Sequence, residues 1–453
     1  MFDQLPVLRA LHLSGNALVD LPADLLNKAS LCSPCVCTGP DAVGLWRLES
    51  CPPGLRLDLA ELSLGSIAAG ALRELSLLRE LYLSDNRLAS LPEGIFDELT
   101  TLQTLRLQGN RLSSLPAGIF DKLIGLEHLY LHGNKLADLA ASVFNKISNL
   151  NTLSLSDNDL ASLPPELFHK LTRLEDLSLE HNKLSSLPPD LFAGLDALLV
   201  LRLDGNAVVS LPQDLFADLT SLSTLSLNSM ALTSLPPGIF DILTSLEHLS
   251  LESNALTALP SGMFDDLSRL ESLHLGDNDF ASLSPSLFQN LTALITLNLP
   301  AHLACGPCIC TRPDDLGLRR LESCPRFPHG TWASLSKQNI SSVAPDAFRG
   351  LTHLKGMFLD SNNLSSLPAG VFNNLSSLFA LYLGNNNLTS LPPGMFSGLT
   401  SLLKLDLSHN NLSVLPPGIF DQLPEYADVD LSQNKLPASV CMNLSYFKYS
   451  LNC

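Results

Sequence analysis

Ten cysteines are the residues of this 453-residue chain whose types and spacing could most directly do chemistry. Eight of them form two clusters with one spacing, Cys-x2-Cys-x-Cys-x13-Cys: Cys32, Cys35, Cys37 and Cys51, then Cys305, Cys308, Cys310 and Cys324. Thiols at this spacing can close two disulfides per cluster. They can also hold a structural Zn²⁺, because Cys-x2-Cys occurs in zinc knuckles. The last two, Cys441 and Cys453, are expected to pair with each other.

Asn-X-Ser/Thr sequons offer a second kind of chemistry, N-glycosylation. Seven can be read, and six of them follow the second cysteine cluster: Asn290, Asn339, Asn363, Asn374, Asn387, Asn411 and Asn443. Their concentration favours a glycosylated chain in an oxidising extracellular compartment, where disulfides persist. The alternative is that Asn is abundant for structural reasons and that Ser or Thr follows by repetition. The sequons favour disulfides over zinc, and we expect no bound metal.

Three groups of outward-facing side chains are candidates for non-covalent ligand contacts. The first holds aromatic, arginine and histidine side chains, of which aromatics and arginine are enriched at binding hot spots: Tyr82, Arg106, His128, Tyr130 and His132. The second is acidic and holds Asp157, Asp176, Glu180 and Asp204. The third, Phe358 and Tyr382, takes corresponding positions later in the chain, beside Lys404 and Asp406. The alternative for each group is an ordinary solvated surface.

Catalysis has little support in the sequence. The eleven histidines are scattered, and His128 and His132 are expected along a strand rather than on one helix face, as HExxH would require. Signatures of serine hydrolases, P-loop enzymes, dinucleotide-binding enzymes and kinases are absent. We therefore predict a chain with no catalytic residues and no cofactor.

The elements that must position these side chains are set by a repeat, seen in residues 105–126 as LRLQGNRLSSLPAGIFDKLIGL. Leu105 and Leu107 alternate with Arg106, which predicts a short strand with both leucines pointing inward. Asn110 is expected to bond backbone groups of its own and adjacent coils in a buried ladder. Phe120 recurs as a spine beneath the far side, where the segments are long enough only for single helical or 3-10 turns.

The same positions recur along the chain in steps of 24 residues. In the central array the asparagine position is filled at 86, 110, 134, 158, 182, 206, 254 and 278. Asn16 belongs to the first array, and we assign Asn339, Asn362, Asn386, Asn410 and Asn434 to the third. Met230 interrupts the column of the central array. Because Met cannot make the amide's hydrogen bonds, we predict faster hydrogen exchange around residues 226–234.

The consensus LxxLxLxxNxLxxLPxxxFxxLxx resembles the typical extracellular leucine-rich repeat. It is similar to the repeats of Toll-like receptor ectodomains, lamprey variable lymphocyte receptors and Slit-like proteins. The resemblance implies a curved α/β leucine-rich repeat solenoid. Short parallel strands would line its concave face, its convex side would be mostly irregular or 3-10, and two cysteine islands would interrupt it.

Each cysteine cluster is similar to the N-terminal cysteine cap of such proteins. That resemblance implies pairing of the first cysteine with the third and of the second with the fourth: Cys32–Cys37, Cys35–Cys51, Cys305–Cys310 and Cys308–Cys324. The C-terminal end departs from the family, because the usual Asn-Pro-Trp-x-Cys is missing there. Flanking residues of the clusters also agree, GLWRLESCP against GLRRLESCP, so an array and its cluster look duplicated.

The predicted division of the chain follows from the repeats and clusters. It comprises the end of a first array (1–31), a cysteine island (32–62), a central array (63–304), a second island (305–338), a third array (339–440) and an end segment (441–453). The first residues match a mid-repeat segment and carry no signal peptide. We therefore expect sequence upstream of Met1.

Charge and hydropathy disfavour several classes of binding partner. The net charge of −18 argues against nucleic acid and anionic membranes, and no apolar run is long enough to span a bilayer. The resulting hypothesis is a non-enzymatic extracellular recognition scaffold, secreted or on the cell surface, that binds a protein or glycan on its concave face. One alternative is a wall, matrix or adhesion protein that self-associates. Another is the ectodomain fragment of a Toll-like signalling receptor.

Overall fold

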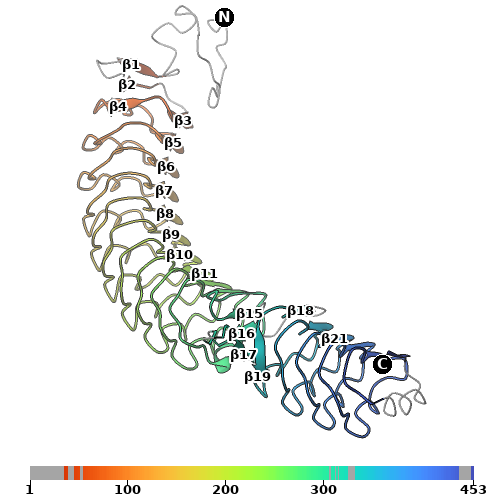
Figure 1. Cartoon of the computed structure of the whole chain (residues 1–453). Coiled ribbons are helices and arrows are strands. Elements are labelled where there is room, and N and C mark those ends of the chain that lie inside the picture. The colour runs from red at the N-terminus through yellow and green to blue at the C-terminus, as the bar shows by residue number, and fades with distance from the viewer. Residues whose placement is uncertain are drawn as a thin grey trace, which may run out of the picture. The chain divides into compact units, whose positions relative to one another are not determined.

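The computed structural model describes residues 35–38, 45–51, 55–305, 308–311, 313–314, 316–324, 332–437 and 450–452. The chain divides into two compact units, Met1–Ala231 (unit 1) and Leu232–Cys453 (unit 2). In both units short parallel strands follow one another as rungs (Figure 1). Within the described residues the only regular helix is the short 3-10 helix η1 (Pro285–Phe288). This is the parallel-strand solenoid that the sequence predicted.

Unit 1 contains one long parallel sheet and one small sheet. The long sheet contains β3 (Arg56–Asp58), β5 (Glu80–Tyr82), β6 (Thr104–Arg106), β7 (His128–Tyr130), β8 (Thr152–Ser154), β9 (Asp176–Ser178), β10 (Val200–Arg202) and β11 (Thr224–Ser226). The small sheet contains β1 (Val36–Thr38), β2 (Trp46–Ser50) and β4 (Leu64–Ile67).

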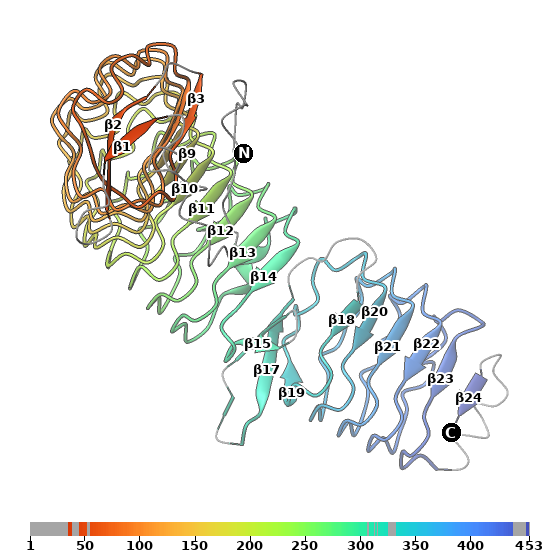
Figure 2. The same cartoon turned by 90° about the horizontal axis from the view of Figure 1, so that it is seen from above.

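Unit 2 repeats this arrangement. The strands β12 (His248–Ser250), β13 (Ser272–His274) and β14 (Thr296–Asn298) are paired in parallel. A small sheet follows, with β15 (Ala304–Cys305), β16 (Cys308–Cys310), β17 (Arg319–Ser323) and β19 (Ile340–Val343). A second parallel sheet, side by side in Figure 2, contains β18 (Trp332–Ser334), β20 (Gly356–Phe358), β21 (Ala380–Tyr382), β22 (Lys404–Asp406), β23 (Asp428–Asp430) and β24 (Ser450–Asn452).

The register of the sheets follows the leucine pattern. Leu105 pairs with Leu81 on one side and with Leu129 on the other, so equivalent residues of successive coils are adjacent. These leucines are fully buried, whereas the two residues that flank each of them on its strand are partly exposed. Since side chains alternate along a strand, one residue in three is committed to the core and two face outward.

Buried asparagines join each coil to the next. The Asn110 Nδ2 donates to the carbonyl oxygens of Leu83, 2.8 Å away, and Leu107, 3.0 Å away. Its Oδ1 accepts the Leu88 N–H at 3.0 Å. The same contacts recur at Asn134, Asn158, Asn182 and Asn206. This asparagine ladder satisfies backbone groups that the turn out of each strand leaves unpaired.

A column of stacked phenylalanines fills the other side of each coil. In unit 1 the rings of Phe96, Phe120, Phe144, Phe168, Phe192 and Phe216 lie 6.2–6.5 Å apart, centroid to centroid. All are buried, and each sits in a run of turns rather than in a helix. The expected spine is therefore present.

Disulfides close the small sheets. Cys35 pairs with Cys51, Cys305 with Cys310 and Cys308 with Cys324. These are the pairs that the family resemblance implied, and cysteines bonded in this way cannot ligate zinc. The side chains of Cys32 and Cys37, and both Cys441 and Cys453, lie outside the described residues, so their pairing remains a prediction.

One position of the asparagine column differs from the sequence prediction. In the coil before Asn362 the ladder position is occupied by Gln338 and not by Asn339. Asn362 Oδ1 accepts the Gln338 N–H at 2.9 Å, and the Gln338 Nε2 donates to the Ser336 carbonyl at 3.2 Å. Gln338 is separated from Asn362 by one 24-residue repeat, so the register is kept. The error arose because Asn339 follows immediately and looks like the ladder residue.

Met230 is fully buried in the asparagine position of its coil. The N–H of Val208, equivalent to that of Leu184 in the preceding coil, therefore has no asparagine oxygen to bond. The backbone around Met230 also changes. Ser229 and Ala231 have φ of 52° and 66°, whereas a coil with Asn, such as that of Asn182, has a positive φ only at the preceding residue, His181. A left-handed alanine is strained, because its Cβ crowds the carbonyl oxygen.

We predict that Met230→Asn stabilises the chain by about 1–3 kcal/mol, because its Oδ1 would give the buried Val208 N–H the acceptor that the equivalent Leu184 N–H has in Asn206. The denaturation midpoint should rise, and exchange of the Val208 amide should slow. Asn206→Met, the reverse change one coil away, is the matched control and should lower the midpoint. A Met230→Asn chain with unchanged or lower stability would show that this rung is already fully satisfied.

No helix in the described parts of the chain has the length and apolar content needed to cross a bilayer.

Candidate functional site

Four side chains on successive strands of unit 1 stack into a single column. The guanidinium of Arg56 lies 4.5 Å from the ring centroid of Tyr82. The guanidinium of Arg106 lies 4.9 Å from the centroids of both Tyr82 and Tyr130. We call Arg56, Tyr82, Arg106 and Tyr130 the Arg–Tyr stack. Each of its three cation–π contacts contributes about 0.5–1 kcal/mol at such exposed sites.

Carboxylates at one end hold the stack in place. The Tyr82 hydroxyl donates to Glu80 at 2.8 Å, and Arg56 forms ion pairs with Glu80 at 3.5 Å and Asp58 at 3.7 Å. Burial, followed by the hydrogen bond to Glu80, raises the pKa of the Tyr82 phenol above its usual value. The phenol therefore stays protonated at neutral pH and acts as a donor. Arg56 was missed in the sequence, although it precedes Glu80 by one 24-residue repeat.

Two buried polar atoms beside the stack have no partner in the structure. They are the Nε of Arg106 and the Oε1 of Gln108, which follows Arg106 by two residues and lies on the same face. Buried donors and acceptors are nearly always bonded, and an unmade bond costs about 1–3 kcal/mol. A ligand or water that paired with either atom would recover that free energy.

The two histidines of the first candidate group have different surroundings. His132 packs edge-on against Tyr130, with centroids 6.2 Å apart, and its Nδ1 lies 3.0 Å from the Ser154 hydroxyl. Burial lowers the pKa of His132 below its usual value, so the ring is neutral at pH 7. His128 is the first residue of β7, two residues before Tyr130, and its Nδ1 lies 3.1 Å from the Thr152 hydroxyl. His132 therefore contacts the stack through the ring of Tyr130, whereas His128 contacts Thr152 on the next strand.

The second candidate group is less purely acidic than its sequence suggested. Arg202 lies within it, forming an ion pair with Asp176 at 2.8 Å and donating to Ser178 at 3.2 Å. Asp204 accepts hydrogen bonds from the Ser226 hydroxyl at 2.6 Å and the Asn228 N–H at 3.0 Å. The side chain of Asp157 is exposed at the rim.

The environment of Glu180 in this group disfavours its ionised carboxylate. Its Oε2 is buried without a partner, and burial, with smaller effects of Asp204 and Asp176, raises its pKa above the usual value despite Arg202. When the pKa of a carboxyl group is higher in the folded than in the unfolded chain, its protonated form favours folding. That stability is fully present below the unfolded-state pKa and is lost as the pH rises through the folded-state pKa. Ionised Glu180 is therefore destabilising at neutral pH.

We predict that Glu180→Gln raises the melting temperature near pH 7, where the wild-type side chain ionises, and has little effect near pH 3, where it is protonated. Thermal melts at both pH values test this. Glu166→Gln, on an exposed turn, is the control and should change neither. An equal effect of Glu180→Gln at both pH values would mean that its ionisation is not the cause.

In unit 2 three aromatic rings form a row across β18, β20 and β21. The ring centroids of Trp332 and Phe358 are 5.5 Å apart, and those of Phe358 and Tyr382 are 4.8 Å apart with nearly parallel planes. The Lys404 Nζ lies 6.0 Å from the Tyr382 centroid. We call Trp332, Phe358 and Tyr382 the aromatic row. The sequence placed Phe358 and Tyr382 together, and Trp332 was missed.

A glycine makes room for Trp332. A Cβ placed on Gly356 would lie 1.9 Å from the Trp332 Cε3, closer than any real contact. The indole therefore lies against the backbone of the next strand, with 51% of Trp332 exposed. A glycine in a strand indicates close approach of another group, and this signal could have located Trp332 from the sequence.

We predict that Gly356→Ala displaces the indole of Trp332 and changes its fluorescence, because the added Cβ occupies the ring's position. The measurement requires a Trp46→Phe background, since Trp46 is the only other tryptophan. Gly384→Ala is the control, because there a Cβ would meet the carboxylate of Asp406 instead. Unchanged emission in Gly356→Ala would contradict the packing of the ring on that glycine.

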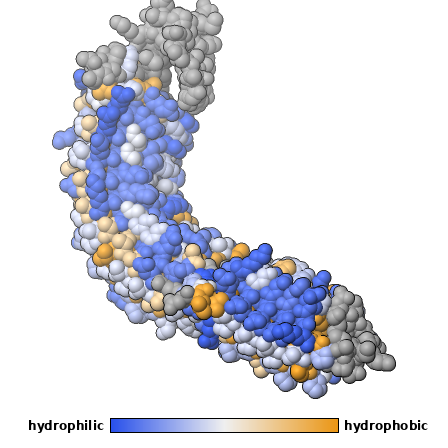
Figure 3. Space-filling view, viewed as in Figure 1, coloured by the Kyte–Doolittle hydropathy of each residue, from blue (hydrophilic) through white to orange (hydrophobic). Residues whose placement is uncertain are grey.

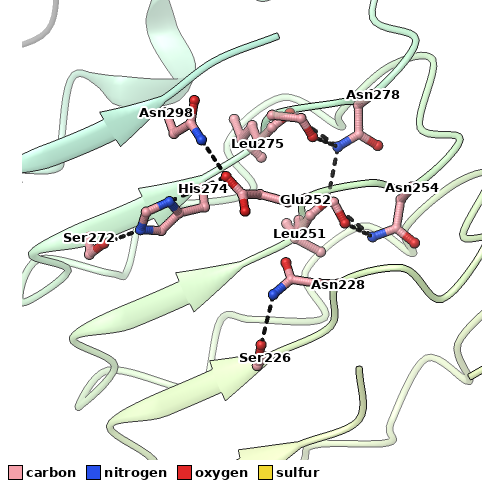
Figure 4. A network of polar contacts seen from close by, with 11 residues as sticks. Ser226, Asn228, Leu251, Glu252, Asn254, Ser272, His274, Leu275, Asn278 and Asn298 are labelled. Carbon is pink, nitrogen blue, oxygen red and sulfur yellow. Dashed lines mark hydrogen bonds and ion pairs between the residues drawn. The ribbon is translucent and has the colours of Figure 1, made fainter. Parts of the chain in front are cut away.

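Figure 4 shows polar networks on neighbouring strands, each within its own unit. In unit 1 the Asn228 Nδ2 donates to the Ser226 hydroxyl at 3.0 Å. In unit 2 the His274 Nε2 lies 2.7 Å from the Ser272 hydroxyl, its Nδ1 lies 3.5 Å from Glu252, and Asn298 donates to the same carboxylate.

The order serine, histidine, carboxylate is that of a nucleophile with its base, but acyl transfer also needs donors for an oxyanion. The nearby N–H groups of Ser272 and Leu275 donate to the carbonyl oxygens of Glu247 and Asn298 and are not available. What the arrangement does is hold His274 in place. Among the described residues no group of three or more His, Cys, Asp or Glu could hold a metal ion.

The face of unit 1 that is turned toward the viewer in Figure 3 is mostly hydrophilic. In Figure 3 a hydrophilic band runs along unit 1, with more hydrophobic residues at its margin. Such a face suits reversible contacts better than constitutive burial.

Two solved chains with TM-scores above 0.5 have the same fold as this chain. In the Toll–Spatzle complex of Drosophila, a chain is 26% identical with a TM-score of 0.57; the match covers 83% of this chain and 52% of that one. A chain of the TLR13–ssRNA13 complex is 24% identical with a TM-score of 0.52, and the match covers 88% of this chain and 54% of that one. A leucine-rich repeat protein of Leptospira interrogans is 26% identical with a TM-score of 0.49, and the match covers 83% of this chain and 89% of that one. The chain thus spans about half the length of the two receptor chains.

Comparison with protein families is more specific, although no curated protein sequence matches the chain. The leucine rich repeat model matches residues 55–112, 100–160, 148–208, 198–256, 244–301, 334–388 and 380–436, well over half of the chain. These segments contain the asparagine ladder, the phenylalanine spine, the Arg–Tyr stack and most of the aromatic row. The chain belongs to the leucine-rich repeat family.

Proposed function

We propose that this protein is a non-enzymatic extracellular recognition scaffold that binds a protein or glycan partner through the strand face of unit 1. The Arg–Tyr stack carries the proposal. Its four side chains lie on four consecutive strands, are held by one another and by Glu80, and remain partly open to solvent. Tyrosine and arginine are the side chains most often found at the centres of protein interfaces.

The contacts within the stack reduce the entropy lost on binding. An arginine or tyrosine immobilised by a partner normally loses about 0.5–1.5 kcal/mol of rotamer freedom. Here that freedom is already restricted before the partner arrives. The Arg106 Nε and Gln108 Oε1, buried beside the stack without a partner, are a donor and an acceptor that a ligand or water could pair with after a shift of these side chains.

An extracellular location is supported by the three disulfides, because such bonds persist in oxidising compartments. The similarity to a chain of the Toll–Spatzle complex also supports a receptor-like role. That similarity favours one second candidate, in which this chain belongs to the ectodomain of a signalling receptor. Because the chain spans about half of the receptor chain's length, this candidate concerns a longer protein.

We predict that combined Tyr82→Ala, Arg106→Ala and Tyr130→Ala weakens partner binding at least about 100-fold, since truncating a hot-spot residue costs about 2 kcal/mol or more. The partner would be found by screening the intact chain against panels of secreted proteins and glycans. Its affinity for wild type and variant would then be measured by surface plasmon resonance. The melting temperature should fall only by the loss of the three cation–π contacts, about 0.5–1 kcal/mol each, because the three side chains lie outside the core.

The control is the pair Arg269→Ala and Tyr426→Ala, which removes the same side-chain types from unit 2 and should leave binding intact. A partner that bound the triple variant as tightly as wild type would refute the assignment of the stack. Size-exclusion chromatography at several concentrations tests the structural alternative. Assembly that grows with concentration, with no other ligand found, would favour a self-associating wall or matrix protein.

A further inference from the structure

The correction at Gln338 reveals a second asparagine column in unit 2. Because Gln338 takes the ladder position, Asn339 lies one residue beyond it, where Asn363, Asn387 and Asn411 lie in the three following coils. Each follows a ladder residue directly: Gln338, Asn362, Asn386 and Asn410. Each also begins a sequon, Asn339-Ile-Ser, Asn363-Leu-Ser, Asn387-Leu-Thr and Asn411-Leu-Ser. We call Asn339, Asn363, Asn387 and Asn411 the sequon column.

The two columns have opposite surroundings. The Nδ2 of Asn386 donates to the carbonyl oxygens of Leu359, at 2.9 Å, and Leu383, at 3.0 Å, so its amide is used by the fold. In the described parts of the chain, the side chains of the sequon column make no hydrogen bond. Asn339, Asn363 and Asn387 are exposed, and Asn411 is partly exposed.

The backbone holds these side chains outside the coil. The N–H groups of Asn363, Asn387 and Asn411 donate to the carbonyl oxygens of Ile340, Leu364 and Leu388 in the preceding coils, at 2.8–2.9 Å. The column therefore keeps the spacing of the coils, about 4.8 Å per rung. Asn339 differs in having a φ of 56°, a left-handed conformation that asparagine tolerates better than most residues.

The fold does not require asparagine at this position. The same place in unit 1 holds Arg87, Arg111, Lys135, Asp159, Lys183 and Ala207, whose N–H groups make the equivalent bonds. The Arg111 N–H donates to the Leu88 carbonyl oxygen and the Lys183 N–H to that of Leu160, both at 2.8 Å. Two of these coils already contain the rest of the sequon, Arg111-Leu112-Ser113 and Lys183-Leu184-Ser185. The hydroxyl residue therefore belongs to the repeat, and repetition accounts for it. Repetition does not account for asparagine at this place in four successive coils of unit 2, because the coils of unit 1 hold Arg, Lys, Asp or Ala there.

We propose that the sequon column carries N-linked oligosaccharides in single file along one flank of unit 2. In the transfer, the Nδ2 of each asparagine would form a bond to C1 of the sugar, donated by a lipid diphosphate-linked oligosaccharide. The bond between C1 and the phosphate oxygen breaks, the diphosphate leaves, and the amide loses one proton. The buried ladder asparagines beside them stay unmodified. The flank of unit 1 has no sequon at the corresponding place and remains bare.

The arrangement gives the two units different chemical surfaces. Oligosaccharides on four consecutive coils would cover the flank beside β18, β20, β21 and β22, whereas Phe358 and Tyr382 project from the strands themselves. Macromolecules would then be excluded from that flank of unit 2 and admitted to the corresponding flank of unit 1.

The test uses the full chain secreted from eukaryotic cells that perform N-glycosylation. Peptide N-glycosidase F in H2¹⁸O converts each glycosylated asparagine to ¹⁸O-labelled aspartate, which mass spectrometry locates. We expect the label on at least three of Asn339, Asn363, Asn387 and Asn411, and none on Asn362, Asn386 or Asn410. Label on two or fewer members of the column overturns the proposal.

Two variants separate the column from a general property of the repeat. Ser365→Ala removes the sequon of Asn363 without changing the asparagine, and should remove its label while leaving the label on Asn387. Arg111→Asn completes a sequon at the matching position of unit 1, and should acquire a label. If Arg111→Asn is labelled but the native column is not, the position is accessible and the proposed column is wrong.

Discussion

The amide of the ladder asparagine is the interaction on which the rest of this structure depends. One side chain supplies two donors and an acceptor, and at Asn110 all of them bond backbone groups of the same or the preceding coil. In the low dielectric of a buried turn, such bonds are strong and their absence is costly. The ladder therefore fixes the spacing of the coils, and the strand register and the phenylalanine spine follow that spacing.

The strand residues that face outward can vary, because the buried core is formed by the ladder asparagines and the leucines. Within one strand Leu105 is fully buried, whereas its neighbours Thr104 and Arg106 face solvent. A change at Arg106 alters what the surface can bind without altering how the coils stack. The same scaffold can hence present a cationic aromatic column in unit 1 and a neutral aromatic row in unit 2.

Much of the fold could be predicted because its determinants are local and periodic. The strands, the asparagine ladder and the stacked phenylalanines each depend on one residue at a fixed place in the repeat. The site was predicted only incompletely, because its members depend on contacts between coils. Trp332 lies where it does because Gly356 has no side chain, and Arg202 changes the acidic group by pairing with Asp176. The error at Asn339 arose because the residue type was expected to be asparagine, whereas Gln338 takes the ladder position and donates to the Ser336 carbonyl.

The coil of Met230 has a mechanical consequence. Coils in a solenoid are joined only to their neighbours, so tension applied along the stack passes through every rung in series. The force needed to pull adjacent coils away from each other depends on the bonds between them, and the coil of Met230 lacks the amide bonds that the coil of Asn206 has. Under load the joint between the coils of Asn206 and Met230 would lack the side-chain amide bonds that join the coil of Asn206 to the one before it, so the sequence sets where along the array the joints differ in strength.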